Sequence, residues 1–132
     1  MMITTKGRNA LKVMIDLARH EGEGFISLAD IAERQNESLK YLEASAKQLT
    51  SAGLVVSARG KSGGYKLSRP AGEYSAAEIL LSGEGSLAPV SCLEEGSVPC
   101  ENAGSCATLP LFKELDDVIM SFLKSKKLTD LV

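Results

Sequence analysis

The sequence predicts a mainly α-helical protein with a small β-hairpin: a winged helix-turn-helix followed by a long C-terminal dimerisation helix. Three observations lead to this fold class. Three short segments before residue 53 carry apolar residues at helical spacing. Two short apolar runs then flank a glycine-rich tip, as in a hairpin. Beyond residue 108 the helical spacing returns in a segment with a wide apolar stripe.

The composition is that of an ordinary folded domain. The 132 residues suit one compact domain with an appended element, and 44% hydrophobic and 24% charged residues are typical values. No apolar run approaches the roughly 18 residues that a membrane-spanning helix needs, and the first six residues lack the apolar core of a secretion signal. We therefore expect a cytoplasmic protein with no membrane partner, whose cysteines remain thiols or bind metal.

Charge is distributed unevenly along the chain. The net charge of −2 is unusual for a nucleic-acid-binding protein. Residues 1–70, however, carry 11 Lys and Arg against 7 Asp and Glu, a net of +4, whereas residues 71–132 carry 4 against 10, a net of −6. The first half therefore has the charge that DNA binding requires, and the acidic half serves another purpose.

The first three helices are predicted from capping residues and apolar spacing. The segment 5–19 is the first helix, and Ser27 begins a second, with Asp30 in a weak capping box. Ser38 is a suitable N-cap for a third helix that ends near Ala52, before Gly53. Four residues of the third helix are expected to point inward: Leu39, Leu42, Ala46 and Leu49. Four are expected to point outward: Ser38, Lys40, Glu43 and Lys47.

The hairpin is predicted from two strands, Leu54 to Ala58 and Tyr65 to Ser68, on either side of a basic tip. Three glycines in the tip allow backbone conformations that other residues resist. A helix followed by a basic wing suits DNA, because a helix fits the major groove and an arginine-bearing loop reaches the minor groove. The alternative is a helical bundle with an ordinary solvated hairpin. The basic charge of this half favours the DNA-binding interpretation.

A boundary is predicted where Pro70 disfavours helix in the residue before it. We divide the chain into a DNA-binding domain over 1–70, a short helix with a cysteine-containing sensor loop over 71–107, and a dimerisation helix with a tail over 108–132. Ser75 and Glu78 form a capping-box pattern for a helix that ends at about Leu81. The segment 82–107 then lacks periodicity, which is typical of a functional or disordered loop.

The last helix has more apolar surface than a small winged helix needs. Leu111, Leu115, Val118 and Phe122 are spaced four, three and four residues apart and form a stripe. One possibility is that this stripe packs on its own domain. We favour a homodimer, in which the helix pairs with its twin, because a dimer reads two DNA half-sites at once.

The cysteines Cys92, Cys100 and Cys106 are separated by seven and five residues. Structural zinc sites usually contain closely spaced cysteine pairs, and this sequence has none. Thiolates at wider spacing in a loop suit an iron–sulfur cluster. From the spacing alone a cluster is only slightly favoured over zinc, and a loop that holds no metal remains an alternative.

The whole chain resembles the IscR/NsrR/CymR superfamily of winged-helix transcription regulators. The resemblance is carried by residues 4–8 (TTKGR), 28–34 (LADIAER), 41–43 (YLE) and 52–55 (AGLV). It is also carried by Arg59-Gly60 with Gly63-Gly64-Tyr65 and by the closing residues 128–132 (LTDLV). The three-cysteine loop before the last helix is similar to the cluster-binding loop of the IscR and NsrR branches.

The resemblance implies roles for individual residues. Recognition-helix contacts to DNA fall on Ser38, Lys40, Tyr41 and Glu43, and wing contacts fall on Arg59, Gly60, Lys61 and Gly63. Thr4, Lys6 and Arg8 correspond to the part that touches phosphates. The cluster ligands fall on Cys92, Cys100 and Cys106.

The fourth ligand of the cluster departs from the family patterns. IscR-like proteins use a histidine shortly after the third cysteine, where this chain has 107–109 (ATL). NsrR-like proteins use an N-terminal aspartate of the partner subunit, where this chain has Arg8. The candidates within the loop are Glu94, Glu95, Glu101 and Thr108. We expect a 2Fe–2S rather than a 4Fe–4S cluster.

The sequence therefore predicts a dimeric regulator that binds double-stranded DNA under the control of an iron–sulfur cluster. The alternative is a cluster-free repressor of the CymR type, controlled by a partner protein or by thiol redox state. An enzyme is disfavoured, because the chain has one histidine, no phosphate-binding glycine motif before a helix and no closely spaced cysteine pair. An interaction module is also disfavoured, since it leaves the basic wing unexplained.

Overall fold

The computed structural model describes residues 3–94 and 104–132. In these residues the chain forms α1 (Thr5–Arg19), α2 (Leu28–Gln35), α3 (Leu39–Ser51), β1 (Val55–Ala58), β2 (Gly64–Leu67), α4 (Ala76–Glu84) and α5 (Leu109–Ser125). Three short 3₁₀ turns cover Ala71–Glu73, Ser91–Leu93 and Leu128–Asp130. The predicted mainly helical winged fold is confirmed.

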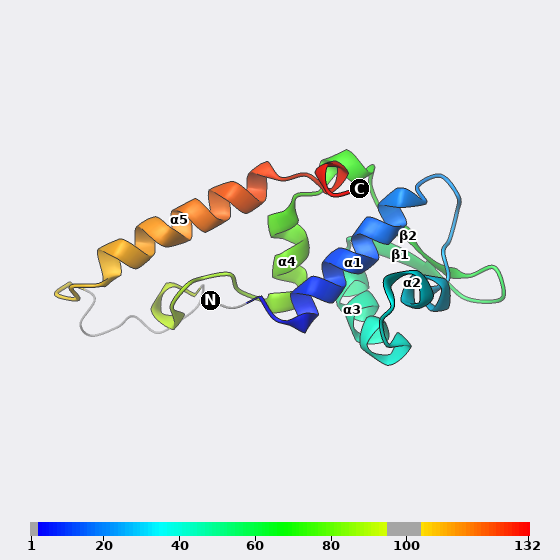
Figure 1. Ribbon diagram of the computed structural model, residues 1–132, viewed down its shortest axis with the longest axis horizontal. Helices are drawn as coiled ribbons and strands as arrows, with labels where there is room; N and C mark the ends of the chain where they lie inside the picture. The colour runs from blue at the N-terminus through cyan, green and yellow to red at the C-terminus, as the bar shows by residue number, and fades with distance from the viewer. Residues whose placement is uncertain (1–2, 95–103) are drawn as a thin grey trace.

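The body of the molecule consists of α1 to α4 and the hairpin, and α5 extends away from it (Figure 1). Helix α1 packs against both α3 and α4, and the base of the hairpin adjoins the same core. The fully buried apolar residues that fill the core include Val13, Met14, Ile31, Leu42, Leu49, Tyr74, Ile79 and Leu128. Leu128 lies beyond α5, so the chain returns to the body after the extended helix.

Hydroxyl residues begin three of the helices. Thr4 accepts a hydrogen bond from Lys6 N–H, Ser27 accepts one from Asp30 N–H, and Ser75 accepts one from Glu78 N–H. These bonds satisfy amide groups that a helix leaves without a partner in its first turn. The start and end of α1 agree with the prediction for 5–19. Gly53, with φ of +76°, follows α3 as expected for a residue that ends a helix.

An ion pair between a buried carboxylate and an exposed arginine fixes α2 against α1. Asp16 is only 2% exposed and accepts hydrogen bonds from Arg34 Nε at 3.0 Å and Arg34 Nη2 at 2.7 Å. Gln35 donates a third bond to the same carboxylate at 3.3 Å. A buried carboxylate is costly unless it is paired and hydrogen-bonded in this way. The orientation of the short helix therefore depends on one polar contact as well as on its apolar residues Ile31 and Ala32.

The hairpin is antiparallel, with Val55 opposite Leu67 and Ala58 opposite Gly64. Its strands begin and end within one residue of the prediction. Ile26 adds a bridge to Tyr65, with 2.8 Å hydrogen bonds in both directions. Ile26, two residues before α2, thus forms a single bridge to the hairpin, which attaches the wing to the helices.

Tyr74 connects the wing, α4 and the C-terminal turn. Its buried hydroxyl donates to Leu54 O at 2.7 Å and accepts from Arg69 N–H at 2.9 Å. Its backbone oxygen accepts from Leu128 N–H at 2.9 Å. The end of the chain is therefore held to the residue that also supports the start of the hairpin.

Three details differ from the sequence-based expectations. Leu39 is 42% exposed rather than inward, because it is the first residue of α3 and lies outside the core-facing stripe. Helix α4 continues to Glu84 instead of ending near Leu81, since Gly83 packs inside it against α1. Glu78 pairs with Arg69 at 2.5 Å, so Ser75 caps the helix while Glu78 serves another contact.

The end of α4 caps the start of α1. Glu84 accepts hydrogen bonds from Gly7 N–H at 2.7 Å, Thr4 N–H at 3.0 Å and the Thr4 hydroxyl at 2.5 Å. Burial alone raises the pKa of Glu84, but these hydrogen bonds and the nearby Lys6 charge outweigh it, so the pKa lies below its usual value. An acid whose pKa is lowered by folding stabilises the fold above its unfolded pKa and loses this effect as the pH falls.

Glu84→Gln is expected to lower the free energy of unfolding by about 1–2 kcal/mol at pH 7, because three bonds lose a charged acceptor. The difference should shrink as the pH falls below about 4.3, the usual pKa of glutamate, since the wild-type carboxylate then also becomes neutral. Urea denaturation at several pH values measures it. Glu73→Gln, at an exposed carboxylate, is the control. Equal stability of the two variants at pH 7 would contradict the role of Glu84.

Candidate DNA-contacting surface and cysteine segment

The first turn of α3 presents the predicted recognition residues. Ser38, Lys40, Tyr41 and Glu43 are all exposed, whereas Leu42, Ala46 and Leu49 on the opposite side are buried. Tyr41 is 62% exposed, which is unusual for a large aromatic side chain. The buried side holds the helix in the body while the polar side remains available to a partner.

The turn between α2 and α3 is tight. Asn36 adopts a left-handed conformation with φ of +53°, a conformation that asparagine tolerates better than most residues. Glu37 N–H donates to Ala32 O at 3.0 Å, and the Glu37 carboxylate pairs with Lys12 of α1. The angle between the two helices is therefore set by backbone geometry and by an ion pair to α1, as a helix-turn-helix requires.

The tip of the hairpin is narrow and basic. Gly60 has φ of +100°, and Gly63 N–H donates to Gly60 O at 3.0 Å. A side chain at Gly63 would collide with the backbone of Ala58 and Arg59, so this position requires glycine. Arg59 and Lys61 are exposed on either side of the turn. The tip has the width and charge that suit a minor groove.

The start of α1 lies beside α3. Lys6 and Arg8 are exposed, and Thr4 is half-buried against Glu84. Lys6 and Tyr41 line one cavity of about 420 Å³ between the two helices. The structure thus brings the predicted phosphate-contacting segment next to the predicted recognition helix, while the wing tip projects from one end of the molecule (Figure 1).

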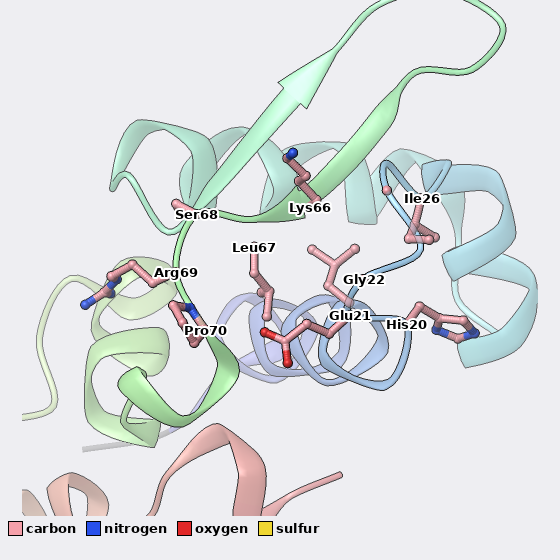
Figure 2. Close-up of a pocket in the computed structure, with 11 residues that line it drawn as sticks. His20, Glu21, Gly22, Ile26, Lys66, Leu67, Ser68, Arg69 and Pro70 are labelled. Atoms are coloured by element: carbon pink, nitrogen blue, oxygen red, sulfur yellow. The ribbon is translucent and has the colours of Figure 1, made fainter.

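A second cavity, of about 430 Å³, lies between the end of α1 and β2. Figure 2 shows Lys66 and Arg69 pointing away from Glu21 in this cavity. Lys66 lies over the Phe25 ring at 4.8 Å, and Arg69 pairs with Glu78. Glu21 accepts a hydrogen bond from Ala71 N–H at 2.9 Å. The charged groups here serve structural contacts, and none of the predicted site residues lines the cavity.

The described cysteines lie at the two ends of the connection from α4 to α5. Cys92 is exposed in the turn Ser91–Leu93, and Cys106 is half-buried two residues before the α5 N-cap, Thr108. Cys100 and two candidate ligands, Glu95 and Glu101, lie outside the described residues. Within 3–94 and 104–132, no three His, Cys, Asp or Glu residues are grouped closely enough to hold a metal ion.

Cys106 has the character of a thiolate ligand. Its Sγ lies 3.4 Å from the Thr108 hydroxyl. This hydroxyl first, and then the backbone N–H groups of Thr108 and Leu109, lower the pKa of the Cys106 thiol, while slight burial opposes them. Thiolate sulfur is the donor that iron–sulfur clusters use, so the chemistry of the cysteines fits such a group.

A third cavity connects this segment to the rest of the molecule. It has a volume of about 580 Å³ and is lined by Leu81 and Glu84 of α4, Leu93 of the cysteine segment, and Met120 of α5. Glu84 therefore faces the cysteine segment and also caps α1. Its role was missed in the sequence because a glutamate at the end of a helix gives no sign of a partner 77 or 80 residues away.

Helix α5 has an uncovered apolar stripe. Leu111, Leu115, Val118 and Phe122 are 61%, 42%, 65% and 56% exposed. No described residue of α5 is buried. Its other apolar side is half-buried and faces α4. In the part of the chain that the structure describes, no helix has both the length and the apolar character to cross a membrane.

Comparison with known proteins agrees with this architecture. The sequence model of the Rrf2 family, described as an iron-dependent transcriptional regulator, matches residues 3–132. The transcriptional regulator IscR of Xenorhabdus nematophila is 42% identical over 132 residues, which are all of this chain and 79% of that protein.

Two solved structures extend the comparison. CymR, the global cysteine regulator of B. subtilis, is 38% identical with a TM-score of 0.80, covering 99% of this chain and 95% of that one. IscR of T. potens is 35% identical with a TM-score of 0.78, covering 99% and 85%. The chain belongs to the Rrf2 family of transcriptional regulators, which are not enzymes.

Proposed function

We propose that this member of the Rrf2 family is a homodimeric, DNA-binding regulator whose operator binding is modulated by an iron–sulfur cluster on Cys92, Cys100 and Cys106. The observation that carries the proposal is the separation of surfaces. The basic residues of α3 and the wing lie on one part of the molecule, and the apolar stripe of α5 lies toward the other end, with the basic start of α1 between them (Figure 1). One surface is suited to DNA and the other to assembly and control.

The DNA-contacting residues divide by chemistry. Lys40 and Tyr41 on the first turn of α3 suit base edges in the major groove, and Ser38 and Glu43 flank them. Arg59 and Lys61 suit a narrow minor groove, where Gly60 and Gly63 let the tip enter. Thr4, Lys6 and Arg8 suit phosphates. Glu43 adds negative charge to a basic surface, so its role in the proposal is to reject wrong sequences.

The apolar stripe of α5 supports the homodimer. A continuous row of exposed large apolar side chains on a soluble protein usually marks an interface. The two-fold pairing of α5 with its copy would place two wings and two recognition helices on one side of the assembly, as required to read two half-sites. The half-buried side of α5 already packs toward α4, so the exposed side remains for the partner.

The three cysteines are the proposed cluster ligands, with Glu94, Glu95, Glu101 and Thr108 as candidates for the fourth. Thr108 already contacts Cys106, and its position at the start of α5 would tie the cluster to that helix. The bound cluster would supply a redox-sensitive and oxygen-sensitive group. A fourth ligand other than histidine would leave one iron more accessible and make the cluster easier to lose.

The connection from cluster to DNA runs through α4 in this proposal. The cysteine segment follows α4, and Glu84 at the end of α4 holds Thr4 and Gly7 at the start of α1. The cysteine segment and the start of α1 would then have two joint arrangements. A cluster that binds one arrangement more tightly than the other would shift the population toward it, to an extent set by that difference in affinity.

A second candidate is a cluster-free regulator that responds to a partner protein or to thiol oxidation. The structural similarity to CymR, named as a cysteine regulator, favours it. In this case Cys106, with its lowered pKa, would be the reactive thiol. Both candidates share the DNA surface and the dimer and differ in the effector.

Arg59→Ala and Lys40→Ala are expected to weaken binding to a duplex selected by the wild-type protein from random sequences. Loss of Lys40 should cost about 1–3 kcal/mol if it contacts a base, and the Arg59 variant should lose most where the minor groove is narrow. Fluorescence anisotropy at several salt concentrations measures both. Lys113→Gln on α5 is the control for net charge. Unchanged affinity and sequence preference in both alanine variants would rule out this placement.

Replacing Val118 and Phe122 together with Asp is expected to convert dimers to monomers, because a buried unpaired charge is costly. Light scattering at micromolar concentration gives the mass. Asp117→Ala, on the polar side of the same helix, should leave the dimer intact. A wild-type protein that is monomeric at this concentration would refute the dimer.

Anaerobic reconstitution is expected to give visible absorbance together with stoichiometric iron and sulfide, and Cys92→Ala or Cys106→Ala should abolish both. Adventitious iron would not depend on both cysteines, so testing Cys92→Ala and Cys106→Ala separately distinguishes it from a bound cluster. Colour that survives replacement of all three cysteines would show that iron binds elsewhere. Absence of any cluster, with DNA binding retained, would favour the cluster-free candidate.

A further inference from the structure

We propose that the cavity between the start of α1 and α3 is a binding site for one sugar–phosphate unit of the operator backbone, with Asn9 and Ser45 as its polar floor. This inference rests on the proposed function and adds a subsite to it. The cavity has a volume of about 420 Å³. Its lining includes Thr5, Lys6 and Asn9 from α1 and Tyr41, Ser45 and Gln48 from α3.

Two polar side chains in this cavity are almost completely buried. Asn9 and Ser45 are each 3% exposed. Among the residues that the structure describes, neither side chain has a hydrogen-bond partner, and no polar atom is fully sealed from solvent without one. The small part of each that remains accessible therefore opens into the cavity. Water in the cavity can therefore bond to these groups, and a ligand that displaces this water has to accept equivalent hydrogen bonds from them.

The position of the cavity favours DNA as the source of that ligand. Its lining includes Lys6 and Tyr41, and Tyr41 belongs to the first turn of α3, which also carries the exposed Lys40. When a recognition helix lies in the major groove, the sugar–phosphate strands form the walls of that groove on either side of the helix. In this arrangement, the DNA strand that borders α3 on its α1 side would pass over the cavity.

The chemistry of the lining suits a sugar–phosphate unit better than a base. The walls are mostly apolar, with Ala44 and the Tyr41 ring beside α1, which suits the carbon face of a deoxyribose. A phosphate only accepts hydrogen bonds, and the Asn9 amide N–H₂ and the Ser45 hydroxyl can both donate. Lys6 at the rim supplies the positive charge. Gln48 adds a neutral donor one helical turn beyond Ser45.

The start of α1 gives a reason for these neutral donors. The Glu84 carboxylate already accepts hydrogen bonds from the N–H groups of Thr4 and Gly7, and the Thr4 hydroxyl accepts one from Lys6 N–H. The first-turn amides that often hold phosphates are thus engaged with a carboxylate. A phosphate near this end of α1 has to be held by side chains, and Asn9 and Ser45 are the two buried donors of this cavity, with no other partner among the described residues.

Asn9→Asp tests the site, because it keeps the shape of the side chain and places a negative charge where the phosphate would lie. With the full-length protein and its selected duplex, we expect about tenfold weaker binding, and a plot of log K against log salt shallower by about one unit. Ser45→Ala should weaken binding less. Gln48→Glu, on the half-buried rim, should act as Asn9→Asp does and gives the same test if the Asp variant does not fold.

A backbone-substituted duplex identifies the contact. Single phosphates are replaced one at a time with neutral methylphosphonates. At one position per half-site, the replacement should lower the affinity of the wild type but cause no further loss of affinity in the Asn9→Asp variant. Lys113→Gln makes the same change in net charge away from the cavity. At every methylphosphonate position, its DNA affinity should change as that of the wild type does. The proposal would be overturned if each methylphosphonate weakened DNA binding by the Asn9→Asp variant as much as it weakens binding by the wild type.

The remaining outcomes separate this site from the proposed function. If Arg59→Ala weakens binding while Asn9→Asp and Gln48→Glu bind as the wild type, the cavity holds only water and the inference is wrong, although DNA binding stands. If the wild-type protein binds no DNA, both fail. A small molecule that occupies the cavity of the wild-type protein without changing its affinity for DNA would also overturn the inference.

Discussion

The close approach of α1 and α4 at Gly7 and Gly83 is the constraint on which both candidate surfaces depend. A Cβ atom at Gly83 would lie 2.9 Å from Lys6 O, and one at Gly7 would lie 2.7 Å from the Glu84 carboxylate. Only glycine allows the two helices to approach this closely. At this separation Glu84 reaches the first turn of α1, so the segment proposed to touch phosphates is attached to the residue that precedes the cysteine segment.

A second junction, at Tyr74, fixes the other end of the molecule. Its hydroxyl joins the segments before and after the hairpin, and its backbone oxygen holds the turn after α5. The Arg69 guanidinium lies 4.3 Å from the ring centre and also pairs with Glu78 of α4. The wing, α4 and the return of the chain from α5 therefore share one support. A short series of hydrogen bonds therefore connects the turn after α5 to the residues on either side of the hairpin.

The features that sequence predicted are local, and those it missed are tertiary. The ends of α1, the caps at Ser27 and Ser75 and the glycine after α3 follow from a few neighbouring residues. The exposure of the predicted recognition residues also follows from periodicity within one helix. The length of α4, by contrast, depends on its contact with α1, since a glycine near a helix end usually suggests termination.

Buried polar groups were the least predictable part. Asp16 stands among apolar residues of α1, and a single sequence gives no sign that Arg34 and Gln35 will bury it. Asn9 was unremarkable for the same reason, because its burial depends on how α3 crosses α1. The candidate surface was therefore predictable as a set of exposed cations, whereas the cavity between them required the packed structure.

The two described cysteines place limits on how a cluster can act. Cys92 follows α4 by a short segment, and Cys106 lies two residues before the N-cap of α5. A cluster bound as we propose would cross-link the end of one helix to the start of the next. The far end of α5 is held through Leu128 at Tyr74, and the end of α4 is held at α1 by Glu84. Because both helices are held at these points, a cluster bound as we propose would act through a tilt of α5 or a shift of the α1 start. In a dimer joined through α5, either movement changes the spacing of the two recognition helices, which is the quantity that operator DNA reads.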